Sequence, residues 1–364
     1  MPTEHPVSPA ATPSGLEVPF DQYQRYRITA EVAGAFEPTG SGPRRALDVG
    51  GHFTDADGRP RRPIRDFLPA WQTVTVDLPV SPLTGYVRAR GDELPFRERS
   101  FDLVSSVDVL EHVPADRREQ LIGHLLRTSR RVVLVAAPFA SPLVSQAEAL
   151  LAAFVERTCG YVQGQLREHR ERGLPDLQAT RKPFTAAGWP AVVFRYGNLW
   201  RWLFMMIDKH AVAALPGGDA VHARLDARYN AHAFASDTDA PCYRHFIVAA
   251  RDANDPVLAF VRRRFAGEID DSPGPGLTPD AVSAAGLIDL ATLHAENQHL
   301  LAVNEPLRRA GEIARLDAEC AELRRHLDVR VRQVEELQDL VRSIEASPSH
   351  RVARAVKRLL GRTS

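Results

Sequence analysis

Four short apolar runs between positions 46 and 139 constrain the fold of this chain more than any other feature. Each run is followed at once by an acidic residue, a glycine or a polar turn. This pattern is typical of a parallel α/β sheet whose strand ends form a binding crevice. The acidic residues at the predicted strand ends are Asp48, Asp77, Asp92 and Asp108. Carboxylates in these places suit a ligand rich in hydroxyl and amino groups, such as a nucleoside.

The apolar pattern predicts seven strands in all. They are expected over residues 46–50, 73–77, 86–89, 101–106, 132–137, 191–196 and 243–250. The run at 132–137 is almost wholly apolar, as a central parallel strand should be. Helices are expected over about 21–36, after Pro114, over 142–166, and between the last two strands. The helix after Pro114 has one apolar face, formed by Leu121, Ile122, Leu125 and Leu126.

Composition narrows the class of protein. Among 364 residues, 46 basic side chains balance 46 acidic ones, so there is no overall charge that favours nucleic acid as a partner. The three cysteines are far apart, which predicts no disulfide framework and no structural zinc site and fits a reducing cytoplasm. No run of eighteen apolar residues occurs, so no transmembrane helix is expected. Residues 1–16 are predicted to be a disordered leader.

The last third of the chain changes character. Residues 256–286, rich in proline and glycine at 270–280, are predicted to be a linker, and residues 287–346 a coiled coil. One heptad register has Arg330 as its single misfit. Its a and d positions are Ile313, Leu316, Cys320, Leu323, Leu327, Val334, Leu337, Val341 and Ile344. A coiled coil would join copies of the chain, whereas the alternative is one long amphipathic helix docked on its own domain.

Residues 347–364 are predicted to form a basic amphipathic helix. Val352, Val356 and Leu359 share one face, and arginines surround it. Such a helix can lie on anionic lipid, which predicts peripheral contact with the inner face of the membrane. The alternative is a solvated basic end.

The acidic strand ends can be given separate roles. Gly50 and Gly51 would let a ligand approach the backbone after Asp48. Asp77 is placed to accept hydrogen bonds from ribose hydroxyls. Asp92 could accept one from an adenine amino group, with Glu93 and Leu94 beside the base. Each aspartate taken alone could equally be a helix cap or a turn residue.

Two segments, GDELPF at 91–96 and FDLVSSVDVLEHVP at 101–114, resemble class I S-adenosylmethionine-dependent methyltransferases, especially the small-molecule "type 11" group. The resemblance covers roughly residues 20–255. It implies an α/β fold, a seven-stranded Rossmann-like methyltransferase sandwich over a domain at 17–255, with S-adenosyl-L-methionine as cofactor.

The resemblance also implies roles for single residues. Asp48 and Gly50, with Gly51, would border the methionine part of the cofactor, and Asp77 and Asp92 would bind ribose and adenine. Residues from Val107 and Asp108 to His112 would line the cofactor and face the substrate. One departure is that the family's second and third loop glycines are missing, since His52 and Phe53 follow Gly51. A non-catalytic methyltransferase-like scaffold is therefore a second hypothesis.

A dehydrogenase is disfavoured because no G-x-G-x-x-G follows the first predicted strand. Methyl transfer to a hydroxyl often needs a base, and His112 and His169 are the candidates. His112 could instead be a histidine at the edge of the core, and His169 a solvated charge on a helix. No metal-ligand arrangement stands out in the sequence.

A narrower resemblance concerns residues 138–160 and 166–177, which look like methyltransferases encoded with bacterial surface-polysaccharide glycosyltransferases. The end of the chain is similar to the tails of such proteins, although those commonly have Trp where His350 stands. It implies O-methylation of a sugar in a surface polysaccharide or lipid-linked precursor, with glycosyltransferases as partners. The alternative acceptor is a small lipid or quinone-type metabolite.

Overall fold

The computed structural model describes residues 18–37, 42–55, 58–213, 218–265 and 313–346. By its internal contacts the chain divides into two units. The first comprises residues 1–203 and 219–274 and holds the α/β sheet. The second comprises residues 204–218 and 275–364. The predicted leader at 1–16 and the predicted tail at 347–364 lie outside the described residues.

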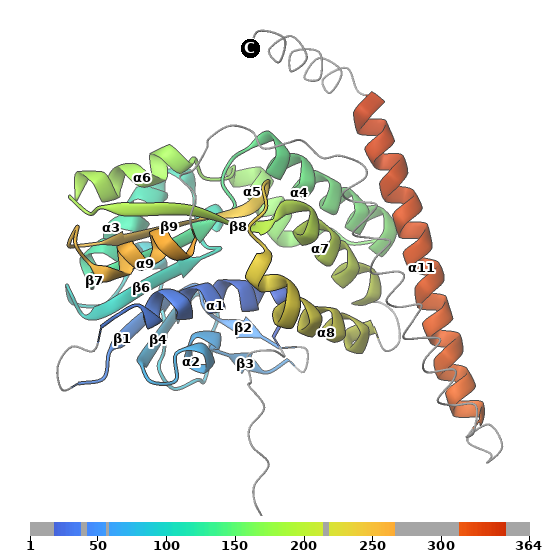
Figure 1. The fold of residues 1–364 in the computed structure, drawn as a ribbon, viewed down its shortest axis with the longest axis horizontal. Helices are drawn as coiled ribbons and strands as arrows, with labels where there is room; N and C mark the ends of the chain where they lie inside the picture. The colour runs from blue at the N-terminus through green and yellow to red at the C-terminus, as the bar shows by residue number, and fades with distance from the viewer. Residues whose placement is uncertain (1–17, 38–41, 56–57, 214–217, 266–312, 347–364) are drawn as a thin grey trace, which may run out of the picture. The chain divides into compact units, whose positions relative to one another are not determined.

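A seven-stranded sheet forms the centre of the first unit (Figure 1). Its order is β5 (Tyr86–Arg88), β4 (Gln72–Asp77), β1 (Arg45–Val49), β6 (Phe101–Val107), β7 (Ser129–Ala137), β9 (Cys242–Ala250) and β8 (Ala191–Asn198). β9 is antiparallel to both of its neighbours, and the other pairs are parallel. The seven predicted strands and their α/β class are confirmed. A separate two-stranded ribbon, β2 (Phe53–Thr54) with β3 (Pro60–Arg61), was not expected.

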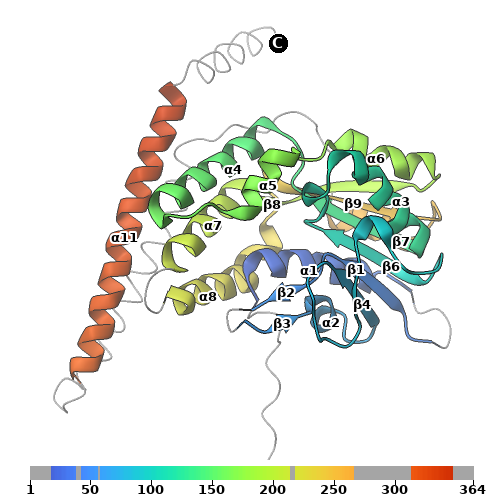
Figure 2. The ribbon, with the colours of Figure 1, turned by 180° about the vertical axis from the view of Figure 1, so that it is seen from behind.

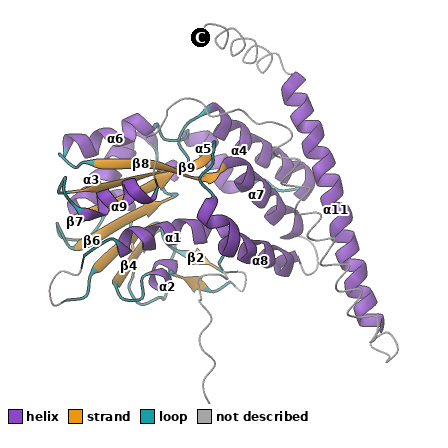
Figure 3. Ribbon diagram, viewed as in Figure 1, coloured by secondary structure: helices purple, strands orange, loops and turns teal. Residues whose placement is uncertain are grey.

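Helices cover both faces of this sheet (Figures 2 and 3). On one face α3 packs with α6, and on the other α1 packs with α2 and α9. The helices are α1 (Phe20–Gly34), α2 (Pro63–Phe67), α3 (Arg118–Thr128), α4 (Pro142–Phe154), α5 (Gly164–Arg172), α6 (Leu177–Ala186), α7 (Leu199–Ala213), α8 (Gly218–Arg228), α9 (Pro256–Arg264) and α11 (Ile313–Ala346). The predicted apolar face of α3 is buried throughout, because it packs against β6 and β7.

Two predicted boundaries are wrong. The helix expected over 142–166 is interrupted: α4 runs into a π-turn, η4 (Val155–Cys159), and ends at Gly160, whose φ of 75° is left-handed. A new helix, α5, then begins at Gly164, and the side chain of Gln163 caps it by accepting from the Leu166 N–H. This break matters because it turns α5 into a separate element that can carry its own functional residues.

The segment assigned to a linker begins too early. Residues 256–264 form α9, and Asp255 caps that helix by accepting from the Val257 N–H. Val257, Leu258 and Val261 are fully buried, because α9 packs on β8 and β9. The α/β body therefore extends to residue 265, and only residues 266–286 of the predicted linker lie outside the described residues.

α11 is a continuous helix over the second half of the predicted coiled coil. Residues 287–312 lie outside the described residues, and pairing of α11 with a second chain stays a prediction. Arg330, the misfit of the heptad register, is buried within the second unit and forms an ion pair with Asp208 of α7. Among the described residues, no helix has both the length and the apolar character needed to cross a bilayer.

Candidate active site

The loop after β1 brings two glycines close to other parts of the chain. Gly50 has a left-handed φ of 82° and its N–H donates to the Val76 carbonyl of β4 at 2.7 Å. A Cβ on Gly50 would lie 2.1 Å from Val109, and one on Gly51 would lie 1.8 Å from an Asp48 oxygen. Any larger side chain would push these groups away, so both positions require glycine.

Asp48 is buried at the end of β1 with two hydroxyl partners. The Tyr26 hydroxyl donates to its Oδ2 and the Ser105 hydroxyl to its Oδ1, each at 3.0 Å. Burial raises the pKa of the Asp48 carboxyl to about 6, and the two hydrogen bonds offset only part of that effect. Asp48 is thus a buried carboxyl that two hydroxyl groups hold in place.

Asp77 ends β4 and accepts two backbone N–H groups. The His52 N–H donates to Oδ2 at 3.0 Å and the Leu78 N–H donates to Oδ1 at 2.7 Å. An ionised carboxylate can accept about four hydrogen bonds, so each oxygen keeps capacity for another donor such as a hydroxyl. The buried Nε2 of His52 has no hydrogen-bond partner among the described residues. Both features suit a ligand with vicinal hydroxyls.

Asp92, in the 3₁₀ turn η1 (Gly91–Glu93), is held by two arginines. Arg90 donates to both of its oxygens at 2.9 Å, and Arg117 donates to Oδ2 at 3.1 Å. The hydrogen bonds from Arg90 lower the pKa of the Asp92 carboxyl to about 2. Beside it, Leu94 is buried while the Glu93 side chain is exposed. The arginines thus supply three of the about four hydrogen bonds that an ionised carboxylate can accept.

Val107 and Asp108 end β6 and begin the next loop. Val107 is buried, and Asp108 adopts a left-handed φ of 53°. Arg244 of β9 donates from Nε to both Asp108 oxygens at 2.8 Å, and Arg25 of α1 approaches at 2.7 Å. Burial opposes ionisation of Asp108, but the two guanidinium groups outweigh it and keep the pKa of the carboxyl below its usual range. Asp108 thus has a structural partner, Arg244, in addition to any ligand that it faces.

These strand ends fit the expected cofactor, S-adenosylmethionine. Its adenosine part offers hydroxyls, and Asp77 has acceptor capacity for such donors. The glycine loop lets the backbone pass directly against Asp48 and Val109 at the end of β1. Since the cofactor contains no phosphate, a phosphate-binding glycine cradle is not needed.

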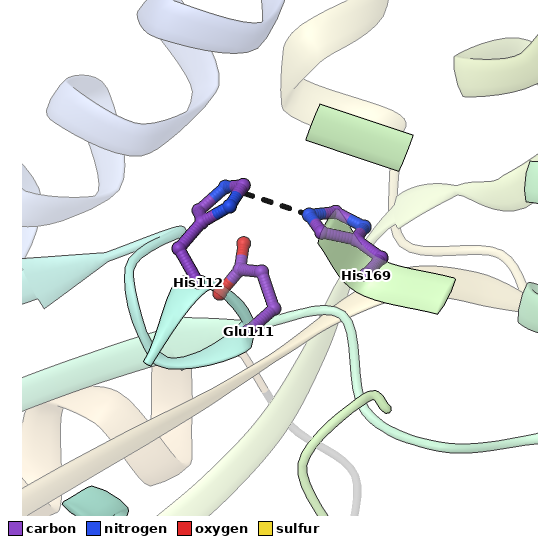
Figure 4. Close-up of side chains that lie close together, drawn as sticks. All are labelled: Glu111, His112 and His169. Atoms are coloured by element: carbon purple, nitrogen blue, oxygen red, sulfur yellow. Dashed lines mark hydrogen bonds between the residues drawn. The ribbon is translucent and has the colours of Figure 1, made fainter. Parts of the chain in front are cut away.

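The two candidate bases, His112 and His169, lie side by side although they are 57 residues apart in sequence (Figure 4). His112 closes the 3₁₀ turn η2 (Leu110–His112) after β6, and His169 lies on α5, which packs against that turn. Their Nε2 atoms are 3.4 Å apart. His169 is only 6% exposed, so the alternative of a solvated charge on a helix is wrong.

Each imidazole is also held by a carboxylate. His112 Nδ1 lies 2.9 Å from Glu168 Oε2, and His169 Nδ1 lies 2.9 Å from Glu148 Oε1 of α4. Tyr243 of β9 donates its hydroxyl to the same Glu148 oxygen at 2.8 Å. Burial and the neighbouring His169 lower the pKa of the His112 imidazole, which favours its neutral form. The chain thus holds a neutral imidazole with fixed orientation beside the end of β6.

Glu111 completes this group. Its side chain is almost fully buried, and its Oε2 has no hydrogen-bond partner among the described residues. Burial, with the nearby charge of Asp108, raises the pKa of the Glu111 carboxyl well above its usual range. Figure 4 shows the Glu111 carboxylate directed toward the space between the two imidazoles. One ligand atom from each of Glu111, His112 and His169 lies within 4.8 Å of the others.

The sequence did not predict most of the side chains that form hydrogen bonds or ion pairs with the site residues. Arg244 is a charged residue inside the apolar run of β9, which was an available signal of a buried ion pair. Glu168 precedes a candidate base directly. Glu148 and Arg117 carried no signal, because helix packing alone brings them to the site.

Comparison with known proteins agrees with this arrangement. Residues 67–133 match a family model described as "Methyltransferase domain". That stretch includes Asp77, Asp92, Asp108, Glu111 and His112 and leaves the glycine loop outside. A search of curated proteins finds no match.

Several solved structures are similar to the chain at low identity. One is a S-adenosylmethionine-dependent methyltransferase of Thermotoga maritima, at 12% identity, covering 64% of this chain and 91% of that one with a TM-score of 0.35. A second comes from Archaeoglobus fulgidus, at 13% identity, 63% and 94% coverage and a TM-score of 0.36. A third is phosphoethanolamine N-methyltransferase 2 of Haemonchus contortus in complex with S-adenosyl-L-methionine, at 15% identity, 62% and 52% coverage and a TM-score of 0.38.

At these scores the solved structures resemble the chain only loosely. The family match is more informative, because it falls on the strand ends whose carboxylates are described above. Together with the sheet order, the match over residues 67–133 indicates a methyltransferase domain that uses S-adenosylmethionine as its cofactor.

Proposed function

We propose that the chain transfers a methyl group from S-adenosylmethionine to a hydroxyl of a sugar, in a cell-surface polysaccharide or its lipid-linked precursor. The paired imidazoles of His112 and His169 carry this proposal, because a hydroxyl acceptor benefits from a group that holds its proton. α4 and α5, which contribute Glu148, Glu168 and His169, belong to the segment that resembles glycan methyltransferases. The sugar assignment rests on that resemblance.

The contacts described above suggest separate roles for the cofactor and for the residues of the site. When bound, the cofactor supplies a methyl group activated by a sulfonium sulfur. Asp77 and Asp92 would hold its ribose and adenine, with Asp48 and Gly50–Gly51 at the methionine end. Orientation of the acceptor and exclusion of water are the protein's contribution to such a transfer. His112, whose side chain is 24% exposed, is the member of the histidine pair that an acceptor can reach.

A non-catalytic scaffold in a glycan-assembly complex is the second candidate. It is favoured by the carboxylates of Asp92 and Asp108, which arginines of the chain itself already engage. A methyltransferase of a lipid or quinone-type metabolite would use the same cofactor residues and differ only in the acceptor.

We also propose that the chain works at the inner face of the membrane as an oligomer, beside glycosyltransferases. The heptads of α11 would join the copies, and the basic residues of 347–364 would contact anionic lipid. Several weak tails joined by a coiled coil would bind more tightly than one.

The first experiment is calorimetric titration of the full chain with S-adenosylmethionine and S-adenosylhomocysteine. Micromolar binding is expected, with a loss of about 10-fold or more in Asp77→Ala, because two or more hydrogen bonds to a charged group disappear. Asp116→Ala is the matched control, since Asp116 is an exposed aspartate of the same domain. Absence of binding to either ligand would favour the scaffold.

The acceptor is tested by transfer of isotopically labelled methyl from the cofactor. Nucleotide sugars and lipid-linked glycans form one panel, and quinone-type phenols and lipids form the other. Labelled sugar that depends on His112 supports the proposal. Labelled product from the second panel alone would replace the sugar with a metabolite.

A further inference from the structure

The cluster of Glu111, His112 and His169 has the chemistry of a metal centre, and we infer that these three residues bind a zinc ion. Two imidazoles and one carboxylate form a common three-residue ligand set for catalytic zinc, which keeps a fourth position open. The three ligand atoms lie within 4.8 Å of one another. All three residues belong to the first unit of the chain and come from η2 and α5.

The carboxylate partners of the two imidazoles decide where the protons of two neutral rings would lie. A neutral imidazole has one N–H, and a carboxylate partner draws that N–H to the nitrogen it faces. Both Nδ1 atoms face carboxylates, of Glu168 and Glu148, so both Nε2 atoms present lone pairs. Two lone pairs that face each other at 3.4 Å repel, and either a shared proton or a metal cation between the rings removes that repulsion.

The separation of the two Nε2 atoms is that of a zinc site. Two nitrogen ligands at the usual Zn–N distance, with a tetrahedral angle at the metal, stand about 3.3–3.4 Å apart. The observed distance is 3.4 Å. Glu111 is the more distant ligand, and its carboxylate would move by up to about 1.5 Å to reach the same ion.

Glu111 supplies a second, independent observation. It is 1% exposed, yet its Oε2 finds no hydrogen-bond partner among the described residues. Burying a polar atom without a hydrogen bond is unfavourable, and more so when the group is charged. A cation beside the two imidazoles would satisfy this oxygen and account for its burial.

The surroundings are those that orient metal-binding histidines. Carboxylate–histidine–metal arrangements fix the ring and raise its basicity, and here each imidazole has its own carboxylate. Tyr243 in turn donates to Glu148, so that carboxylate is itself held in place. His169 is buried while the His112 side chain is 24% exposed, which leaves the cluster accessible from the His112 side.

Imidazole ligands select zinc over magnesium, which prefers carboxylate and water oxygens. The role of the ion rests on the proposed function, whereas its binding does not. With zinc bound, the open position would take the acceptor hydroxyl and lower its pKa. The histidines would then serve as ligands rather than as bases, and the hydroxyl proton would pass to solvent water as the oxygen takes the methyl group.

The test uses the full chain, stripped with a chelator and titrated with ZnCl₂ in competition with a chromophoric chelator. One equivalent of zinc is expected to bind. His112→Ala and His169→Ala should each weaken binding at least ~100-fold, and Glu148→Gln about 10- to 100-fold. His124→Ala, at a histidine that contacts Arg127 on α3, should leave binding unchanged. MgCl₂ should not compete.

X-ray absorption on the zinc-loaded wild type keeps the inference testable if a variant fails to fold. Nitrogen and oxygen ligands at about 2.0–2.1 Å with imidazole scattering are expected, whereas a sulfur shell at about 2.3 Å would move the metal to a cysteine and overturn the site. Binding by His169→Ala with wild-type affinity, no saturable zinc binding, or equal affinity for magnesium would overturn it as well. Titration of the same preparation with S-adenosylhomocysteine tests the cofactor site separately, so the two proposals can fail independently.

Discussion

Asp48 shows how one buried carboxyl links stability to pH. Its pKa is raised from 3.8 in an ordinary environment to about 6 in the fold. A group that binds its proton more tightly in the folded state stabilises the fold only while it stays protonated. That contribution is therefore present below pH 4, falls as pH rises, and is gone above about pH 6. The rise in pKa corresponds to a stabilisation of the folded state, at low pH relative to high pH, of roughly 3 kcal/mol.

Replacing Asp48 by Asn removes the charge and keeps the shape. We expect Asp48→Asn to raise the free energy of unfolding at pH 7.5 by about 1–3 kcal/mol, and to make little difference near pH 4. Denaturant unfolding of variant and wild type at both values measures this. An equal difference at the two pH values would contradict the burial effect.

Asp92 is the matched comparison for Asp48, because its carboxyl pKa is lowered rather than raised. Arg90 and Arg117 lower its pKa to about 2, so its ionised form stabilises the fold above pH 4 and loses that effect as pH falls toward 2. Asp92→Asn should therefore lower stability at neutral pH, where Asp48→Asn raises it.

For single residues, the sequence predicted which side chains lie at the site better than it predicted which other side chains they contact. Asp48, Asp77 and Asp92 were found because strand ends in a parallel sheet meet at one edge. The arginines that hold Asp92 and the approach of His112 to His169 depend on helix packing, which no local pattern encodes. Two histidines judged separately as bases became one cluster for that reason.

Among the elements, β9 joins parts of the α/β body that lie far apart in sequence. Its Arg244 is buried and donates to Asp108 after β6 and to Gln24 of α1. Removing one partner of a buried ion pair leaves an uncompensated charge, which costs about 3–5 kcal/mol. Arg25 stays near Asp108, so the lower end of that range is expected here.

Arg244→Met should therefore lower the free energy of unfolding by about 3 kcal/mol. Asp108→Asn added to it removes the stranded charge, and asparagine tolerates the left-handed φ of position 108. The double variant should recover at least half of the loss in urea denaturation. A double variant no more stable than Arg244→Met would show that the packing of Arg244, rather than its charge, matters. Arg97→Met, at an exposed arginine, serves as control.

Element types were predictable and their interruptions were not. The strands carry continuous apolar runs, and α3 carries a clear apolar face, so both were found. The break at Gly160 was missed because the apolar pattern of α4 continues into it, while the left-handed turn depends on one glycine. α9 was missed because it is short and begins with a proline, Pro256.

The whole molecule combines a methyltransferase body with a long helix, α11. Some of the apolar heptad positions of α11 are buried and others are partly exposed. Cys320 and Leu337 are buried, whereas Leu327 and Val334 at a positions are only half-buried. A helix that leaves part of such a seam open is suited to pair with a second copy. The sequence indicated the heptads because their repeat is a local pattern.

We expect the wild type to be oligomeric, and Leu327→Asp with Val334→Asp to shift it to monomer in size-exclusion chromatography with light scattering. Two buried carboxylates in the seam would each cost several kcal/mol in the oligomer. Binding of S-adenosylhomocysteine should change by less than about 2-fold, because the cofactor residues lie in the other unit. Arg325→Asp with Arg332→Asp is the matched control, since these exposed residues occupy f positions of the same register. A monomeric wild type over the full concentration range would instead assign α11 to contacts within one chain.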